Sequence, residues 1–351
     1  MKLIIMLFFT LLSQTTFSQN DTLKKLNFSA FGELYYSYDF SNPQNHEKPN
    51  FLYNHKRHNE VNANLLLVKA NYFDTIYRAN LGLMAGNYAQ YNLSTEPIWA
   101  QFIYEANIGV KISKRRNIWL DAGIMPSHIG FENAISADCW TLTRSILAEN
   151  SPYYETGIKL SYISKNEKLN LSALLLNGWQ RIRRFDYFQR PAFGTQFTYV
   201  PSKKISFNYS NFVGSSKPDS VNAIRHFHNF YLQYNATKKI GLIVGFDIGM
   251  DKMSLTKYGT WYSPVLILRL NVNEKTRMAL RVEYYNDPNQ IIILTSTANG
   301  FQTFGLSSNL DFDVNDKVRF RFEGKMFHSK DKIFSNNNNN FSLTTNMTIR
   351  L

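Results

Sequence analysis

Leu26-Asn27-Phe28-Ser29-Ala30-Phe31-Gly32-Glu33-Leu34-Tyr35-Tyr36-Ser37-Tyr38-Asp39-Phe40 is the clearest structural signal in the sequence. Its even positions are apolar, aromatic or glycine, whereas most of its odd positions are polar, among them Glu33 and Asp39. Alternation with a period of two predicts a β-strand with one apolar and one largely polar face. The stretch is also much longer than the usual run of about five or six residues in a soluble sheet.

The same alternation recurs along the whole chain. Apolar residues occupy every second position of 98–110 and 240–250, and the opposite faces are polar or rich in glycine. The pattern predicts about sixteen strands, an even number as in bacterial outer-membrane barrels. They lie near residues 26–40, 59–73, 76–88, 98–112, 117–125, 153–163, 168–179, 191–200, 204–213, 226–236, 240–251, 260–272, 276–286, 300–313, 317–328 and 341–351.

The connections between these strands alternate in length. Every second connection is tight and polar, as at Asp74-Thr75, Pro201–Lys203 and Asn273–Lys275, whereas most of the others are long. Short turns on one side and long loops on the other are the signature of an outer-membrane β-barrel. The last strand, 341–351, can pair with the first and remove both sheet edges, which lipid would not tolerate. We therefore expect an all-β fold, a transmembrane antiparallel up-and-down β-barrel of about 16 strands.

The width of such a barrel decides which face meets water. Sixteen strands spaced about 4.8 Å apart and tilted by about 40° close at a backbone radius of roughly 16 Å. Side chains alone cannot fill that space, so the polar face must line water and the apolar face must meet lipid. The expected pore-lining residues are the basic Arg269, Arg277, Arg281, Arg319, Arg321 and Lys325 and the acidic Glu33, Glu105, Asp121 and Glu155.

The longest connection runs from Pro126 to Pro152, on the long-loop side. It contains several large apolar side chains, such as Trp140, which would be poorly placed in free water. We therefore expect it to fold into the lumen; the alternative is an external flap. The candidate constriction residues in this loop are Glu132, Asp138, Arg144 and Glu149. The single cysteine, Cys139, is expected to be packed rather than reactive.

Composition excludes several classes of protein. Hydrophobic residues make up 44% of the 351 residues and there is one cysteine, so the chain is neither disordered nor a disulfide-stapled scaffold. The net charge of +13 comes from basic residues scattered among acids, which does not favour nucleic-acid binding. No GxSxG, HExxH or phosphate-binding loop occurs, and His226 and His228 lack further metal ligands. We expect no enzyme activity, no cofactor, no metal and no nucleic-acid partner.

The first eighteen residues have the pattern of a secretory signal. Lys2 precedes an apolar run from Leu3 to Leu12, and Thr16 and Ser18 follow, which is the order of n-region, h-region and cleavage site. We expect residues 1–18 to be a signal peptide and residues 19–351 to form the barrel domain. A lipid anchor needs a cysteine directly after the cleavage site, and Cys139 lies far from it. The chain is thus expected in the bacterial envelope.

Four sequence blocks carry a resemblance to a known family: Asp121–Glu132, Trp140–Ser145, Ala148–Gly157 and Asn177–Ile182. They look like the β-barrel porins of the OmpL-like type found in Bacteroidetes outer membranes, most strongly over residues 117–185. The resemblance implies a channel in the bacterial cell outer membrane, and it brings no ligand-binding residues with it. A homotrimer is expected only by analogy with this family.

The expected function is passive diffusion of small hydrophilic solutes through a water-filled outer-membrane porin, in contact with outer-membrane lipid and lipopolysaccharide. The excess of inward basic residues predicts a mild anion preference. Basic residues on the last five strands would face acidic residues on the first six; alternatively, these are only solvated wall charges. Two other functions remain open: a substrate-selective channel for anionic solutes, and a non-conducting barrel that acts as an adhesin or assembly scaffold.

Overall fold

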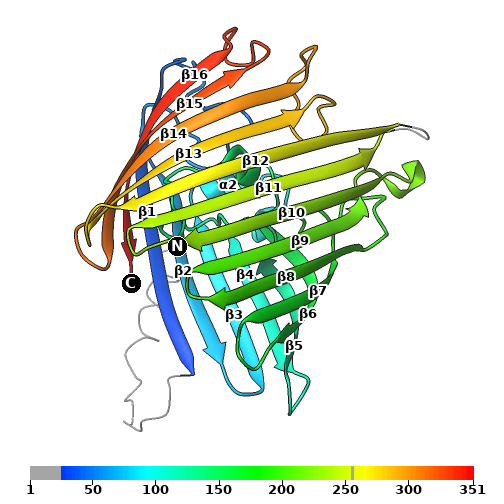
Figure 1. Ribbon diagram of the computed structural model, residues 1–351. Helices are drawn as coiled ribbons and strands as arrows, with labels where there is room; N and C mark the ends of the chain where they lie inside the picture. Colours follow the sequence, from blue (N-terminus) through cyan, green and yellow to red (C-terminus); the bar gives the residue numbers. More distant parts are fainter. Residues whose placement is uncertain (1–24, 254–256) are drawn as a thin grey trace, which may run out of the picture.

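The computed structural model describes residues 25–253 and 257–351, so the expected signal peptide, residues 1–18, lies outside the described residues. The described residues form one closed antiparallel sheet of sixteen strands, joined in chain order (Figure 1). The expected all-β up-and-down barrel and its strand number are confirmed. Nearly all strand positions agree with the alternation in the sequence to within a few residues.

The strands of the barrel are long, as membrane-spanning strands must be. They are β1 (Leu26–Asp39), β2 (Val61–Phe73), β3 (Tyr77–Ala85), β4 (Ile103–Lys111), β5 (Asn117–Pro126), β6 (Tyr154–Ile163), β7 (Leu169–Leu176), β8 (Ala192–Ser202), β9 (Ile205–Ser215), β10 (Ile224–Asn235), β11 (Ile240–Lys252), β12 (Tyr258–Asn271), β13 (Thr276–Asp287), β14 (Phe301–Asp313), β15 (Val318–Ser329) and β16 (Asn339–Arg350).

Short helices interrupt the loops between strands. They are α2 (Asn87–Asn92), η1 (Ile98–Ala100), η2 (Ser136–Asp138), α3 (Ile146–Glu149) and η3 (Asp219–Val221). Among the described residues, no helix has the length and hydropathy needed to cross a membrane. The η1 turn corrects one expectation: the alternation at 98–102 predicted a strand, but β4 begins only at Ile103. Residues 98–100 form this turn, and the exposed apolar side chains of Trp99 and Phe102 produced a strand-like alternation in the sequence.

The two faces of the sheet are inverted relative to a soluble barrel. On β1, Phe28 is 76% exposed on the outside, whereas Glu33 is fully buried on the inside. The same division holds on β15, where Phe322 is exposed and Arg321 and Glu323 are buried. An apolar exterior and a charged interior are stable together only when hydrocarbon surrounds the barrel.

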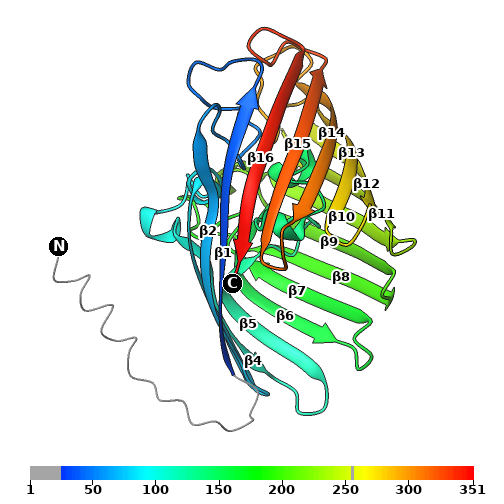
Figure 2. The same cartoon turned by 90° about the vertical axis from the view of Figure 1, so that its left-hand side faces the viewer.

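Strands β1 and β16 close the barrel. They pair antiparallel from Phe31 opposite Arg350 to Asp39 opposite Ser342, and Figure 2 shows them side by side. Closure gives every strand two hydrogen-bonded neighbours, which an apolar solvent requires because it cannot satisfy free backbone groups.

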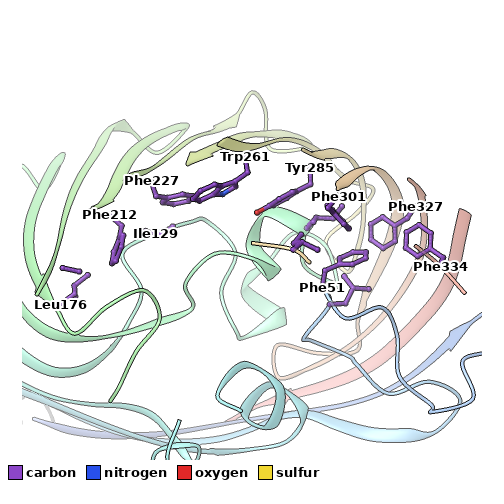
Figure 3. Packing of buried hydrophobic residues seen from close by; sticks show 14 of the residues in the cluster. Phe51, Ile129, Leu176, Phe212, Phe227, Trp261, Tyr285, Phe301, Phe327 and Phe334 are labelled. Carbon is purple, nitrogen blue, oxygen red and sulfur yellow. The ribbon is translucent and has the colours of Figure 1, made fainter. Parts of the chain in front are cut away.

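The loops at one end of the barrel build a packed core inside it. Phe51 of the 40–60 loop packs edge-on against Phe301 of β14, with ring centroids 4.8 Å apart, and against Phe327 of β15. Phe334 of the 330–338 loop stacks on Phe327, and Figure 3 shows these rings together beneath the strands. The long-loop end of the lumen is therefore a structured region and not an open mouth.

Candidate functional site: the loop-filled interior of the barrel

The 127–153 loop folds into the barrel and binds the inner wall. Thr143 donates its backbone N–H to Glu323 of β15 at 2.6 Å, and Ile146 donates to Glu283 of β13 at 2.6 Å. Leu142 donates its N–H to the Asn309 side chain of β14 at 3.0 Å. The loop therefore lies inside the lumen, as its apolar side chains predict, rather than outside as a flap.

Arg281 of β13 is the centre of this attachment. Its guanidinium donates to Thr143 O at 2.8 Å, to Thr141 Oγ1 at 2.9 Å and to Glu323 Oε1 at 2.7 Å. Glu283 lies 3.4 Å away and Glu132 of the loop lies 3.7 Å away. Arg281 has no exposed surface. A fully buried arginine among three carboxylates attaches a loop and does not contact solutes.

Two basic residues of β15 bind the 136–144 segment of the same loop. Arg321 is held by Asp311 at 2.7 Å and donates to Ser136 O at 2.7 Å and Cys139 O at 3.1 Å. Lys325 donates to Arg144 O at 2.8 Å. Each of these cations thus satisfies loop carbonyls that would otherwise be buried without a partner.

Inward-facing glycines on β11 make room for the loop. A Cβ at Gly245 would lie 2.7 Å from the ring of Phe131, and one at Gly241 would lie 2.7 Å from the ring of Trp140. Arg269 of β12 covers the Trp140 ring with its guanidinium 4.0 Å from the centroid. A larger inward residue at either glycine would push the loop away from the wall.

The four candidate constriction residues have different surroundings. Arg144 is fully buried and donates to the carbonyls of Asn133, Leu142 and Ala134, so it holds the loop in its own shape. Glu132 accepts the N–H of Ser145, and burial raises the pKa of its carboxyl group although Arg281 opposes this. Glu149 accepts the N–H of Tyr53 at 2.9 Å and so joins this loop to the 40–60 loop. Asp138 is partly exposed and pairs with Arg350 at 2.6 Å.

The four inward carboxylates expected to form an acidic wall are all buried, and each is paired. Glu33 accepts from His55 at 2.8 Å, and Glu105 pairs with Lys69 at 2.7 Å. Asp121 binds Arg78, and Glu155 pairs with His128 at 2.7 Å. Burial lowers the pKa of His55 although the adjacent Glu33 opposes this, and His55 Nε2 donates to the Glu33 carboxylate.

The expected basic wall is also largely neutralised. Arg281, Arg321 and Lys325 do not line open water as expected, because the loop covers them and carboxylates pair with them. Arg277 and Arg319 are partly exposed and share Asp313. The expectation of a basic wall opposite an acidic wall is therefore corrected: most charges of both signs are paired with each other. Pairwise partners across neighbouring strands cancel most of the field that such walls would make.

Cavities with polar lining residues lie near both ends of the interior. The first, of about 380 Å³, lies near the short turns and is lined by β1–β6, including Asn80, Asn107 and Lys159. Here a row of asparagines crosses the sheet: Asn71 donates to Asn80 at 2.6 Å, and Asn80 to Asn107 at 2.8 Å. The second, of about 460 Å³, lies among the long loops. The 127–153 loop occupies part of the interior, where it is bound to the inner wall at β13–β15.

Sequence reasoning missed several residues of this interior. Asp311 and Asp313 neutralise the arginines, and their alternation with the outward-facing Leu310 and Phe312 already places them on the inner face. The inward glycines of β11 also alternate with apolar residues, and this small-residue pattern was a signal for a packed loop. Lys48 and Thr143 lie in irregular loops, where the alternation gives no information.

Comparison with known proteins gives the family. The family described as "Putative beta-barrel porin-2, OmpL-like" matches residues 25–351. No curated protein sequence matches the chain. Similar solved structures include an anion-selective porin from Comamonas acidovorans, with 8% identity, 93% of this chain and 99% of that chain covered, and a TM-score of 0.62.

Two further structures have the same fold. The outer membrane channel DcaP of Acinetobacter baumannii has 8% identity, 92% of this chain and 97% of that chain covered, and a TM-score of 0.60. The trimer form of OmpT from Vibrio cholerae has 8% identity, 92% and 98% covered, and a TM-score of 0.56. At these identities the likeness shows the fold alone, but the family match runs from residue 25 to the last residue. The chain therefore belongs to the OmpL-like β-barrel porin family of the bacterial outer membrane.

Proposed function

We propose that this protein is a restricted porin, a water-filled channel for passive diffusion of small hydrophilic solutes across the outer membrane. One observation carries the proposal: cavities with polar lining residues lie near both ends of a closed barrel, and the 127–153 loop occupies part of its interior. Solutes that only diffuse must meet weak binding along the pore, and the paired charges of the wall provide this. Family and fold favour a channel rather than an enzyme.

We also propose a mild anion preference, which follows from the charges of one cavity. In the cavity lined by β1–β6, Glu105 and Asp121 are neutralised by Lys69 and Arg78. Lys159 also lines this cavity, and within the described part of the chain it forms no ion pair. An unpaired ammonium at the polar surface attracts anions and repels cations. The anion-selective porin of Comamonas acidovorans shows that this fold is compatible with such selectivity.

Recordings in planar lipid bilayers test the proposal. Purified folded protein is expected to conduct KCl, to exclude larger sugars in a graded series, and to give a reversal potential on the anion side in a salt gradient. Saturable current that one solute inhibits would instead favour a substrate-selective channel. Absence of any conductance from correctly folded protein would overturn the proposal and favour an adhesin or assembly scaffold.

We further propose a homotrimer in contact with outer-membrane lipid and lipopolysaccharide. The apolar exterior, with exposed residues such as Phe28, Leu34 and Phe322, suits contact with lipid and with other copies of the barrel. The trimer form of OmpT supports the proposal by fold only. Mass measurement of the protein in detergent tests it, and a monomeric mass at high protein concentration would contradict it.

A further inference from the structure

The cleft of about 460 Å³ among the long loops has a mixed lining. The 40–60 loop contributes Lys48 and Phe51, the 288–300 loop contributes Ile293, and the 330–338 loop contributes Ile333 and Phe334. Its volume is in the range of sites that hold small organic molecules, about 300–1,000 Å³. The cleft therefore has the size of a binding site, and its chemistry depends on Lys48.

Lys48 is buried at the cleft without a partner for its ammonium. The residue is only 3% exposed, and it is one of the residues that line the cleft. Within the described residues, its side chain forms no hydrogen bond and no ion pair. A buried charge without a partner costs free energy, so native proteins keep one mainly where something else pairs with it.

The carboxylates around Lys48 are already engaged. Glu149 accepts from Tyr53 and Asn54 of the 40–60 loop, and Glu323 accepts from Thr143 and Arg281. The other acidic groups are likewise bound: Asp39 accepts from Ser41 and Asn340, and Glu47 pairs with Arg57 and accepts from Tyr91. The second basic group near Lys48 is Lys325, which pairs with Glu283. Asp39 and Glu47 each use one carboxylate oxygen in these contacts. None of the four acids lies within ion-pair distance of the Lys48 ammonium, and Glu149, Asp39 and Glu323 attract it only at longer range.

Apolar side chains form one part of the lining beside Lys48, and the remainder is polar and includes Asp39, Glu47 and the exposed Lys332. Phe51 and Phe334 are buried with ring centroids 6.2 Å apart, and Figure 3 shows them at the same place in the barrel. Ile293 is buried beside them, and Leu294 is 77% exposed at the rim. An ammonium next to aromatic and aliphatic side chains matches a molecule with one anionic end and an apolar body.

We propose that this cleft binds small organic carboxylates, with the carboxylate paired to Lys48 and the carbon skeleton against Phe51, Ile293 and Phe334. The inference rests on the proposed function, because it names a solute class that the channel concentrates at its long-loop end. Burial, together with the ammonium of Lys325, lowers the pKa of Lys48 to about 8, so the side chain remains mostly protonated at neutral pH. Its charge is then available to a carboxylate.

Calorimetric titration of the detergent-solubilised barrel tests the inference with benzoate and its neutral isostere benzamide. Benzoate is expected to bind at least about ten-fold more tightly than benzamide, because only benzoate makes a charge-assisted hydrogen bond. In Lys48→Met the benzoate affinity is expected to fall to the benzamide level. The matched control is Lys330→Met, since Lys330 is exposed in the adjacent loop and does not line the cleft.

Several outcomes would overturn the inference. Equal affinities of the wild-type protein for benzoate and benzamide would do so even if Lys48→Met failed to fold, and so would undetectable binding of benzoate. Unchanged benzoate affinity in a folded Lys48→Met protein would show that another group binds the anion. KCl conductance without ligand is measured separately: conductance without benzoate binding refutes only this site, and binding without conductance refutes only the proposed channel.

Discussion

Replacing Arg281 with methionine is expected to release the 127–153 loop while the barrel stays closed. The substitution removes the donors to Thr141 and Thr143 and leaves Glu283 and Glu323 buried with less positive charge around them. Removal of one partner from a buried ion pair costs about 3–5 kcal/mol. The strands keep all their backbone hydrogen bonds, so the cost falls on the attachment of the loop to the wall.

The size of this cost sets the expected change in population. Each 1.36 kcal/mol is a factor of ten, so 3–5 kcal/mol shifts the ratio of released to attached loop by roughly a hundred-fold to a few thousand-fold. The released loop no longer narrows the interior. Single-channel conductance of Arg281→Met should therefore exceed that of the wild type.

Limited proteolysis with trypsin provides a second readout. Arg144 is the only Lys or Arg between residues 127 and 153, and it is fully buried in the attached loop. Cleavage after Arg144 is expected in Arg281→Met and not in the wild type. Arg115→Met is the control, because Arg115 is exposed in a short turn. A folded Arg281→Met barrel with wild-type conductance and a protected Arg144 would refute the reasoning.

Three further predictions concern single residues. Gly245→Ala puts a Cβ 2.7 Å from Phe131 and should raise conductance and trypsin cleavage, whereas Gly324→Ala, with its nearest contact at 3.4 Å, should change neither. Lys159→Glu should move the reversal potential in a KCl gradient toward cations; an unchanged potential would contradict the role of this ammonium. Lys48→Met should raise the melting temperature at pH 7, because the fall in the Lys48 pKa from 10.5 to about 8 corresponds to about 3 kcal/mol. As pH rises, the folded protein loses this proton before the unfolded chain does. The difference in melting temperature between Lys48→Met and the wild type should therefore shrink between pH 8 and 10.5, and a difference that does not change with pH would contradict the lowered Lys48 pKa.

The alternation of apolar and polar residues along the sequence was sufficient to predict the strands and which face of each strand points inward. The side-chain period of a strand is two, so the odd positions of 26–40 place Glu33 inside, and the same count places Arg281 and Arg321 inside. Charge on one face and apolar groups on the other then imply lipid outside. The large apolar residues of the longest connection likewise predicted a loop inside the barrel. These conclusions depend only on residues close together in sequence and on which solvent, water or lipid, each face contacts.

Only the tertiary structure decided what the interior charges do. Arg281 contacts Thr143, which is 138 positions away in sequence, and Lys325 contacts the Arg144 carbonyl, which is 181 positions away. Likewise, Lys48 has no acid within ion-pair distance, an outcome that depends on how three loops and the wall come together. Alternation predicts which side of a strand contacts lipid, because lipid contacts every strand in the same way. It does not predict which buried charge pairs with which partner, because the partners come from distant segments that meet only when the barrel closes.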